Sequence, residues 1–433
     1  MTHSLTTAEA DAIVAKDEQY IMRPWTHPKG EPVIVARAKG CVVTDVHGYT
    51  DYLDFTAGYF VNNAGHCHPR IVEAATAQLS QVLQVSGKHG TIPAIRSLSG
   101  CELVAADDQP GLLSPPAAPR PTSCVEDGAS GLGQERHRLP RQRLPRAHPR
   151  RPRGHRQRQV PRERGQAAGG HSFTIPNAYC YRCKFGPAAS CKVECLDGVE
   201  AQLAARPTGA ILAEPIQSVG GLAPPRKWWD RLDGIRKKLG LLLIIDEVQT
   251  GLGRSGKMFG LEHYGLEPEI VSGGKGLSGG VGSLAMTCAG TDVIKKFFGG
   301  TTPTNGGNAV SAAAGIALID TLIDEGMIAN AAAMGQHFTE AAWALRDPWI
   351  GDVRFTGLLG GIELVSSTST KEVLPKAALA AIKDDLHDAG MLITMSGTHG
   401  NCLRLQPPLV VTAAQIDTFL ATLKQVLASV RAR

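Results

Sequence analysis

Two short apolar runs, each ending in an acid, form the clearest pattern of hydrophobic and polar positions in the chain. The first covers residues 209–213 and leads into Glu214, and the second, five large aliphatic residues at 241–245, leads into Asp246. Uninterrupted runs of this kind are typical of strands buried on both faces of a parallel sheet. Open α/β sheets bind ligands beyond the carboxyl ends of their strands, so we expect Glu214 and Asp246 side by side at a binding edge.

Weaker patterns predict the elements around this sheet. Residues 38–55 alternate short strands with a turn, which is typical of a hairpin. The alanine-rich segment 309–322 predicts an amphipathic helix, and residues 350–364 predict strands of a small carboxy-terminal α/β domain. Thr412 is placed to cap a closing helix that runs to about Val430.

A lysine flanked by glycines follows the second apolar run. Lys275 lies 29 residues after Asp246, and its glycine neighbours allow backbone and ligand to approach closely. One amine and one carboxylate are what pyridoxal phosphate needs, because the amine forms a Schiff base and the carboxylate keeps the pyridine nitrogen protonated. A turn-capping acid and an unrelated surface lysine would explain either residue alone, but they do not explain the whole run. The sequence therefore predicts a pyridoxal phosphate site.

The segments 246–259, 262–270 and 275–280 closely resemble class III aminotransferases. The resemblance extends over roughly residues 25–105 and 172–430. It implies an α/β protein of fold type I, in which a large domain with a mostly parallel sheet is joined to a small C-terminal α/β domain.

The resemblance also implies a division of the chain. We expect residues 1–65 to pack with the small domain, residues 66–315 to form the large domain that binds pyridoxal phosphate, and residues 316–433 to form the small domain. The reaction it implies is transfer of an amino group from an amino acid, including ω-amino acids, to a 2-oxo acid.

Four residues acquire cofactor roles from the resemblance. Lys275 is expected to carry the cofactor and to act as acid and base, and Asp246 is expected to hold the ring protonated. Gln249, three residues after Asp246, is expected to reach the cofactor's phenolic oxygen or the substrate. Thr304, in the segment 304–308, is expected to bind the phosphate of the neighbouring subunit's cofactor, which implies a homodimer with active sites at the interface.

Three further residues acquire substrate roles. Arg404 is expected to clamp a carboxylate with its guanidinium, and Glu214 is expected to pair with Arg404 and release it when a carboxylate arrives. Tyr59 falls where the family lines its substrate pocket. Two alternatives stay open, since Tyr59 also suits a core position and Arg404 also suits the edge of a surface strand.

Two other activities have partial support in the sequence. The glycines at 251, 253 and 256 satisfy a dinucleotide-binding pattern, but four residues separate them from the strand and no helix start follows, so we reject that function. Residues 37–40 and 65–69 also resemble dialkylglycine decarboxylase. That enzyme has glutamine where this chain has Tyr59, which favours transamination.

Composition sets the broad class. The chain has 433 residues, 43% hydrophobic and 20% charged, which suits a globular protein of about two domains. No apolar run approaches the ~20 residues of a membrane helix, and the first twenty residues lack the basic start and apolar core of a secretion signal. We therefore expect a cytoplasmic protein that does not enter the membrane.

The cysteines at 180, 183, 191 and 195 have a spacing that suits zinc. Similar segments occur in class III members without an implied metal, and a cytoplasmic location argues against disulfides. We expect reduced structural thiols and no metal.

The charge is unevenly distributed. The whole chain carries +5, but residues 109–170 contain 13 Arg, no Lys and 4 acids, a balance of +9, together with 10 Pro. This composition cannot build a core. A nucleic-acid-binding arm and a linker are both less attractive than a third explanation, because the tract stands where the family has other sequence.

Arginine without lysine, amid proline, glycine and alanine, is what GC-rich codons give when translated out of frame. The hypothesis is a pair of compensating frameshifts that alters residues 105–172. The family's phosphate loop and the aromatic that stacks on the cofactor ring should lie in this tract. The sequence therefore predicts an impaired enzyme, and a non-catalytic remnant stays as an alternative.

Overall fold

The computed structural model describes residues 5–20, 33–48, 51–85, 90–96, 123–127, 173–186, 190–205, 208–290, 293 and 306–433. Apart from the backbone of residues 123–127, the Arg/Pro-rich tract lies outside the described residues, and so does Thr304. The expectations for these residues therefore stay predictions.

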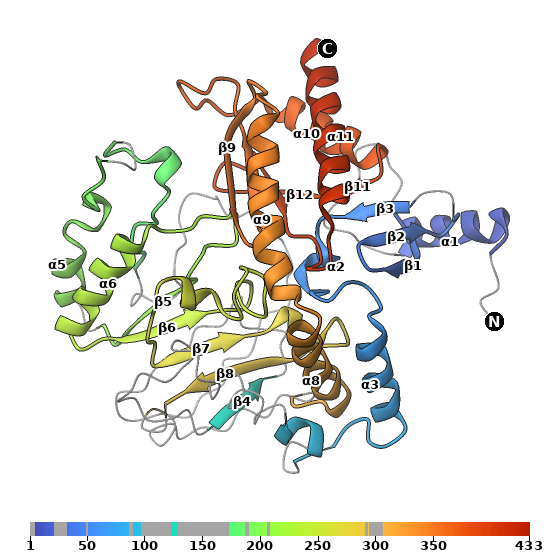
Figure 1. The fold of residues 1–433 in the computed structure, drawn as a ribbon, viewed down its shortest axis with the longest axis horizontal. Coiled ribbons are helices and arrows are strands. Elements are labelled where there is room, and N and C mark those ends of the chain that lie inside the picture. Colours follow the sequence, from blue (N-terminus) through green and yellow to red (C-terminus); the bar gives the residue numbers. More distant parts are fainter. Residues whose placement is uncertain are drawn as a thin grey trace.

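A five-stranded sheet forms the centre of the larger half of the molecule (Figure 1). Its order is β4 (Ser123–Asp127), β8 (Ala285–Ala289), β7 (Ile270–Gly273), β6 (Leu242–Asp246) and β5 (Ala210–Ala213). The strands β5, β6 and β7 are parallel to one another. The strand β8 runs antiparallel to β7, and β4 runs antiparallel to β8. The predicted α/β fold, with a parallel core to this sheet, is confirmed.

The second apolar run forms β6, but the expectation that it is buried on both faces is wrong. Leu243 and Ile245 are buried, whereas Leu242, Ile244 and Asp246 are half-buried. Side chains alternate between the two faces of a strand, so one face of β6 is fully covered and the other only partly.

Helices and short 3-10 turns make up the rest of the described part of this half. The helix α3 (Pro69–Leu79), which starts with proline at its first turn, packs against α8 (Ala309–Asp324). The Asn308 side chain caps α8 by accepting hydrogen bonds from the backbone amides of Val310 and Ser311. The remaining elements of this half are α5 (Val199–Ala204), α6 (Arg226–Lys238) and the 3-10 turns at Cys180–Arg182, Glu194–Leu196, Gly260–His263 and Lys275–Ser278.

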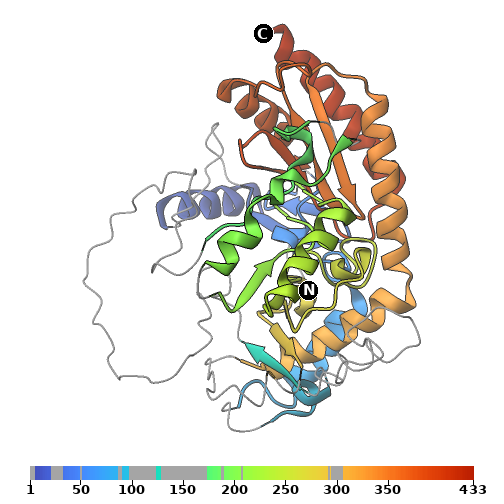
Figure 2. The same cartoon turned by 90° about the vertical axis from the view of Figure 1, so that its left-hand side faces the viewer.

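The C-terminal part contains a second sheet, which is antiparallel throughout. Its order is β12 (Thr394–Ser396), β13 (Cys402–Leu405), β10 (Leu359–Leu364) and β9 (Ile350–Thr356). The helices α9 (Met327–Ala344), α10 (Lys376–Asp388) and α11 (Ala413–Ala432) accompany it. Figure 2 shows α9 along the edge of the molecule, with the small sheet on its inner side. Thr412 caps α11 as predicted, in a reciprocal pair with Gln415.

The N-terminal part begins with α1 (Thr7–Tyr20) and the predicted hairpin of β1 (Val35–Lys39) and β2 (Val42–Asp45). The next strand, β3 (Asp51–Asp54), pairs with β2 and also, in parallel, with β11 (Met391–Leu392) from the other end of the chain. Backbone hydrogen bonds therefore tie the N-terminal segment to the C-terminal part.

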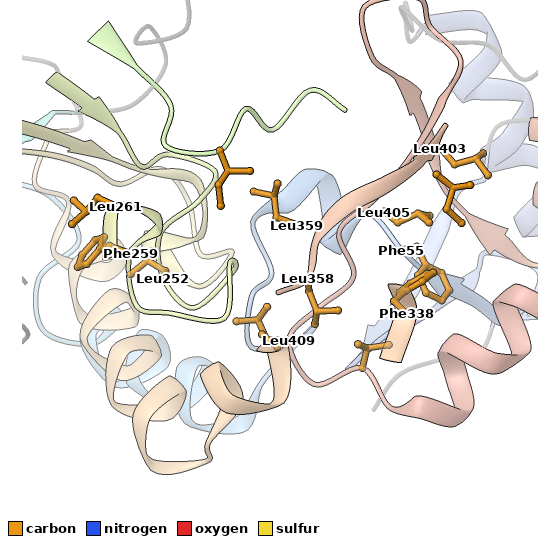
Figure 3. Close-up of a cluster of buried hydrophobic side chains, with 14 of the residues drawn as sticks. Phe55, Leu252, Phe259, Leu261, Phe338, Leu358, Leu359, Leu403, Leu405 and Leu409 are labelled. Atoms are coloured by element: carbon orange, nitrogen blue, oxygen red, sulfur yellow. The ribbon is translucent and has the colours of Figure 1, made fainter. Parts of the chain in front are cut away.

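One continuous set of buried apolar side chains joins the three parts (Figure 3). Its large-domain members include Leu252 and Phe259, and the Phe55 ring lies 4.5 Å from the Phe419 ring on α11. Between them lies Leu409, which is fully buried. The domain boundaries at 65 and 315 stay predictions.

Candidate active site

Three of the predicted site residues lie at the carboxyl ends of adjacent parallel strands. Ala213, the last residue of β5, pairs with Ile245, so Glu214 and Asp246 follow side by side. Asp246 in turn pairs with Ser272 on β7, and Lys275 comes three residues later. The topology thus brings two acids and one amine to a single edge of the sheet, as the sequence predicts.

The carboxylate of Asp246 is half-buried. Its Oδ1 accepts a hydrogen bond from the backbone amide of Val248, 2.9 Å away. Burial raises the pKa of Asp246, while the Val248 amide and the charge of Lys275 act to lower it. An acid held this way is fixed in orientation and has one oxygen left for another partner.

Glu214 lies beside Asp246 and is also largely buried. Its Oε2 accepts from the Ser218 backbone amide at 2.9 Å. Burial raises the pKa of Glu214, the nearby charge of Asp246 adds to the rise, and Ser218 and Arg404 oppose it. Glu214 and Arg404 therefore interact electrostatically, although within the described parts of the chain no ion pair of 4.0 Å or less joins them.

The side-chain amide of Gln249 connects Lys275 and Arg404. With its oxygen turned toward the two cations, the Gln249 side chain accepts hydrogen bonds from Lys275 Nζ and from Arg404 Nη2, the latter at 3.2 Å. Its nitrogen then donates to Gln406 Oε1 at 3.2 Å. Burial, followed by the charge of Arg404, lowers the pKa of Lys275 to about 8, against the opposing effects of Glu214 and Asp246.

A strained turn at residues 57–60 lies next to Lys275 and Arg404. The short element α2 (Ala57–Phe60) has positive φ at all four residues: 48° at Ala57, 59° at Gly58, 70° at Tyr59 and 73° at Phe60. Left-handed backbone costs a residue with a side chain roughly 1–2 kcal/mol. Only Gly58 adopts it without that penalty.

The turn separates its two aromatic rings. Phe60 is buried, and the centre of its ring lies 3.9 Å from Arg404 Cζ and 5.7 Å from Lys275 Nζ. Tyr59 is 62% exposed, and its ring centre is 5.3 Å from that of Phe60. Tyr59 is still near enough to Arg404 for its hydroxyl to influence the pKa of the guanidinium.

Sequence reasoning missed Phe60 and Gln406. Gln406 lies two residues after Arg404, so strand alternation could have placed both side chains on one face. No such signal existed for Phe60, because a left-handed turn over three residues with side chains is not written in the pattern Thr-Ala-Gly-Tyr-Phe.

The cysteines at 180, 183, 191 and 195 lie close to one another as free thiols. Burial, followed by the neighbouring cysteines, raises the pKa of Cys180 and of Cys195. Among the described residues, no group of three or more His, Cys, Asp or Glu side chains is arranged to hold a metal ion. The expectation of structural thiols stays a prediction.

With this site in view, comparison with known proteins becomes decisive. The sequence profile of the family described as aminotransferase class-III matches residues 25–102 and 172–427. The chain belongs to the class III aminotransferase family. The predicted family, its fold type and its reaction class are thereby confirmed.

Individual relatives extend over nearly the whole chain. The chain is 30% identical to an acetylornithine aminotransferase of Methanosarcina mazei, over 96% of each protein. It is also 30% identical to a taurine–pyruvate aminotransferase of Bilophila wadsworthia, over 98% of each. Among solved structures, an (S)-enantioselective ω-transaminase from Thermomicrobium roseum superposes with a TM-score of 0.80 at 22% identity, covering 98% of this chain and 100% of the other, so it supports the fold alone.

The described helices give no evidence for a membrane span, since none of them is both long and apolar enough to cross a bilayer. The cytoplasmic location stays a prediction.

Proposed function

We propose that this chain holds pyridoxal phosphate between Lys275 and Asp246 and transfers an amino group between substrates whose carboxylate binds Arg404. One observation carries the proposal, namely that Lys275, Asp246 and Arg404 surround a single site at the strand ends. The family is pyridoxal-phosphate-dependent, and these residues match its pattern. The residue assignments are ours.

The site has the donors that such a ligand requires. Arg404 Nε and Gln406 Nε2 are buried and lack a hydrogen-bond partner within the part of the chain that the structure describes. Buried donors without partners are costly, so their presence at a site supports binding of a ligand with acceptor groups. Asp246 at the edge of the sheet and the amine of Lys275 are the other two polar groups that would contact the ligand.

When bound, pyridoxal phosphate supplies an aldehyde that condenses with amines and a ring that withdraws electrons. Lys275 serves the proton transfers. Because its pKa is lowered to about 8, an appreciable fraction of its amine is neutral near pH 7.5, whereas an ordinary lysine is almost fully protonated. Neutral Nζ can remove the proton from the substrate carbon that bears the amino group and return it later.

Asp246 and Gln249 orient what binds beside Lys275. Asp246 is fixed by the Val248 amide, so its free oxygen is available to a protonated ring nitrogen. Gln249 connects the amine to the guanidinium and therefore sets the distance between the reacting end and the carboxylate end of a substrate.

Arg404 and Glu214 form the carboxylate end. Both are largely buried, and each shifts the pKa of the other. A substrate carboxylate would take over the neutralisation of Arg404, and a substrate without one would leave that task to Glu214. This exchange accounts for the use of two chemically different substrates at one site.

Covalent trapping tests the role of Lys275. The full chain is incubated with pyridoxal phosphate, reduced with borohydride and mapped by peptide mass spectrometry. The expected adduct lies on Lys275, is abolished in Lys275→Ala and persists in Lys257→Ala, which removes an exposed lysine nearby. An adduct that persists on another lysine in Lys275→Ala would contradict the assignment.

We also propose that residues 105–172 impair the enzyme. Support comes from the family profile, whose match stops at residue 102 and resumes at 172. Without the family's phosphate loop, a dianion would lack backbone donors at a helix start. Cofactor affinity, transamination and melting should all improve when these residues are re-translated in the alternative frame, and equal values for both chains would refute the idea.

A homodimer is part of the proposal. The side chains of Leu79, Leu83, Ile92 and Ile95 on and after α3 are 51–69% exposed, which suits a surface that a second copy covers. Sedimentation of the full chain should give the dimer mass, and Leu83→Asp should shift it toward the monomer. A monomeric parent chain would contradict the proposal.

The amino donor and acceptor are best sought among the substrates that the relatives' names give. A panel of acetylornithine, ornithine, taurine and alanine with pyruvate or 2-oxoglutarate, run on frame-restored protein, would identify them. Release of carbon dioxide from 2-aminoisobutyrate would instead indicate the decarboxylase activity.

A further inference from the structure

The left-handed turn at residues 57–60 is the most unusual backbone feature next to the site. Three of its four residues carry side chains, and such conformations persist only where the surrounding structure enforces them. Strained backbone concentrates where a protein must hold a group in a fixed place. Asp54 holds this turn, and the turn presents Phe60 to the two cations.

A single carboxylate holds it. Asp54 Oδ1 accepts from the Thr56 backbone amide at 2.7 Å and from its hydroxyl at 2.6 Å. Asp54 Oδ2 accepts from the Gly58 amide and contacts His66 Nε2, both at 2.8 Å. Burial would raise the pKa of Asp54, but the hydrogen bonds from His66, Thr56 and Gly58 outweigh it and lower the pKa. The carboxylate is thus fully committed to the turn.

His66 is itself held in place. Its Nδ1 lies 3.2 Å from Nδ2 of Asn62, just beyond the turn. A methyl group on Gly58 would approach that same Nδ2 to 2.3 Å. A side chain at residue 58 would therefore collide with Asn62, so glycine suits this position for its size as well as for its positive φ.

What the turn holds is the Phe60 ring. The face of an aromatic ring attracts cations, and Arg404 and Lys275 both lie within the ~6 Å range of that attraction. Within the described residues Arg404 has no acid at ion-pair distance, and its Nε has no partner. The ring therefore supports the guanidinium together with Gln249, whose oxygen accepts a hydrogen bond from Nη2.

Stacking has a geometric consequence. The Phe60 ring, centred 3.9 Å from Arg404 Cζ, uses none of the N–H donors along the edge of the guanidinium. A carboxylate binds at that edge, in the plane, through two parallel hydrogen bonds. Because phenylalanine has no polar group, it orients Arg404 without competing for the donors that a carboxylate needs.

We propose that Phe60 is a positioning residue for carboxylate recognition, presented to Arg404 by the turn that Asp54 holds. The inference rests on the proposed function, in which Arg404 binds the substrate's carboxylate. It adds a determinant of substrate class, since substrates with a carboxylate depend on the ring and those without it do not.

The test measures binding of succinate, a simple carboxylate probe, to the full chain by titration calorimetry without added cofactor. Phe60→Leu should weaken binding about 2- to 30-fold, the range expected for loss of a cation–π contact. Phe60→Tyr keeps the ring face and should restore affinity to within about 2-fold of the parent.

A matched control separates positioning from general packing. Phe55→Leu removes a buried ring that packs against the rings of Phe338 and Phe419 in the core. It should lower the melting temperature about as much as Phe60→Leu while leaving succinate affinity unchanged. Equal affinity loss in both leucine variants would mean that the effect is one of folding, and would overturn the inference.

Arg404→Ala distinguishes this inference from the proposed function. If Arg404→Ala abolishes succinate binding while Phe60→Leu binds like the parent, the inference is wrong and the proposed function stands. If the parent chain does not bind succinate, or Arg404→Ala does not weaken it, the carboxylate role of Arg404 fails and the inference fails with it.

Discussion

Lys275 and Arg404 lie over the same aromatic ring, with Nζ of the lysine 5.7 Å and Cζ of the arginine 3.9 Å from its centre. Two cations therefore share one small, largely buried space. Burial and the arginine charge together lower the pKa of Lys275 to about 8. The positive charge of Arg404 therefore favours the neutral amine of Lys275, in addition to the effect of burial.

The first prediction concerns the reactivity of Lys275. Only the neutral amine attacks an acylating reagent, so modification of Lys275 in the cofactor-free chain should rise with a midpoint near pH 8. Arg404→Met removes a positive charge and should move the midpoint to higher pH. Asp246→Asn removes a negative charge and should move it lower. Modification at Lys275 is followed by mass spectrometry, and a midpoint that ignores both changes would contradict the electrostatic account.

Glu247, the neighbour of Asp246, provides a prediction about stability. Its carboxylate is buried and accepts hydrogen bonds from Thr250 and from the amides of Gly260 and Leu261, at 2.9 and 2.7 Å. Burial nonetheless raises its pKa from the ordinary 4.5 to about 7. The folded state therefore binds this proton more tightly than the unfolded state does.

The sign of the pH dependence follows. Between pH 4.5 and about 7 the unfolded chain releases the proton first, so the free energy of unfolding should fall as the pH rises. The Glu247 contribution is about 3 kcal/mol over this window. Glu247→Gln cannot ionise at this position and should lose this slope. Denaturant unfolding at pH 5 and 7.5 measures it, and an unchanged slope in the variant would exclude Glu247 as the source.

A third prediction concerns the ion network at the small sheet. Glu363 is fully buried and accepts from Tyr179, from Arg182 Nε at 2.6 Å and from Arg354 Nη1 at 2.8 Å. Glu363→Ala should destabilise the chain by about 3–5 kcal/mol, because it removes the acid that pairs with Arg182 and one of the two acids that pair with Arg354. Asp352→Ala should cost less, since Glu363 still neutralises Arg354. Similar losses in both variants, measured by denaturant unfolding, would argue against the network.

The cap of the last helix gives a fourth prediction. Thr412 accepts a hydrogen bond from the backbone amide of Gln415, and the Gln415 side chain accepts one from the amide of Thr412 in return. Thr412→Ala should therefore cost about 1 kcal/mol. Thr418→Ala, on an exposed turn of the same helix, should be near neutral. Thermal melting compares the two, and equal shifts would show that the cap contributes nothing.

Much of this architecture was predictable from local pattern. The acids that end β5 and β6, and the lysine after β7, follow from the rule that parallel strands end at one edge. The Thr412 cap follows from the chemistry of helix starts. These features are local in sequence, so a single stretch of residues determines each of them.

The details that set the geometry were not predictable. The stacking of Phe60 on Arg404 joins residues far apart in the chain, and it depends on a left-handed turn that the Asp54 carboxylate holds with the help of His66. Likewise, β6 was expected to be covered on both faces, because its sequence shows hydrophobicity but not which helices lie over it. Tertiary contacts decide such features, and no periodicity encodes them.

The parallel pairing of β3 with β11 has a consequence for biosynthesis. Leu53 pairs with Met391, so this strand finds its partner only after the ribosome has made the chain as far as residue 391. Until then Leu53 and Phe55 lack their backbone hydrogen bonds to Gly390 and Leu392, and Arg404 has not yet been synthesised. The pocket is consequently assembled only after Arg404 has been made, in a step that joins two segments far apart in the sequence. Nascent chains halted before residue 391 should present β3 to proteases, whereas the finished protein should protect it.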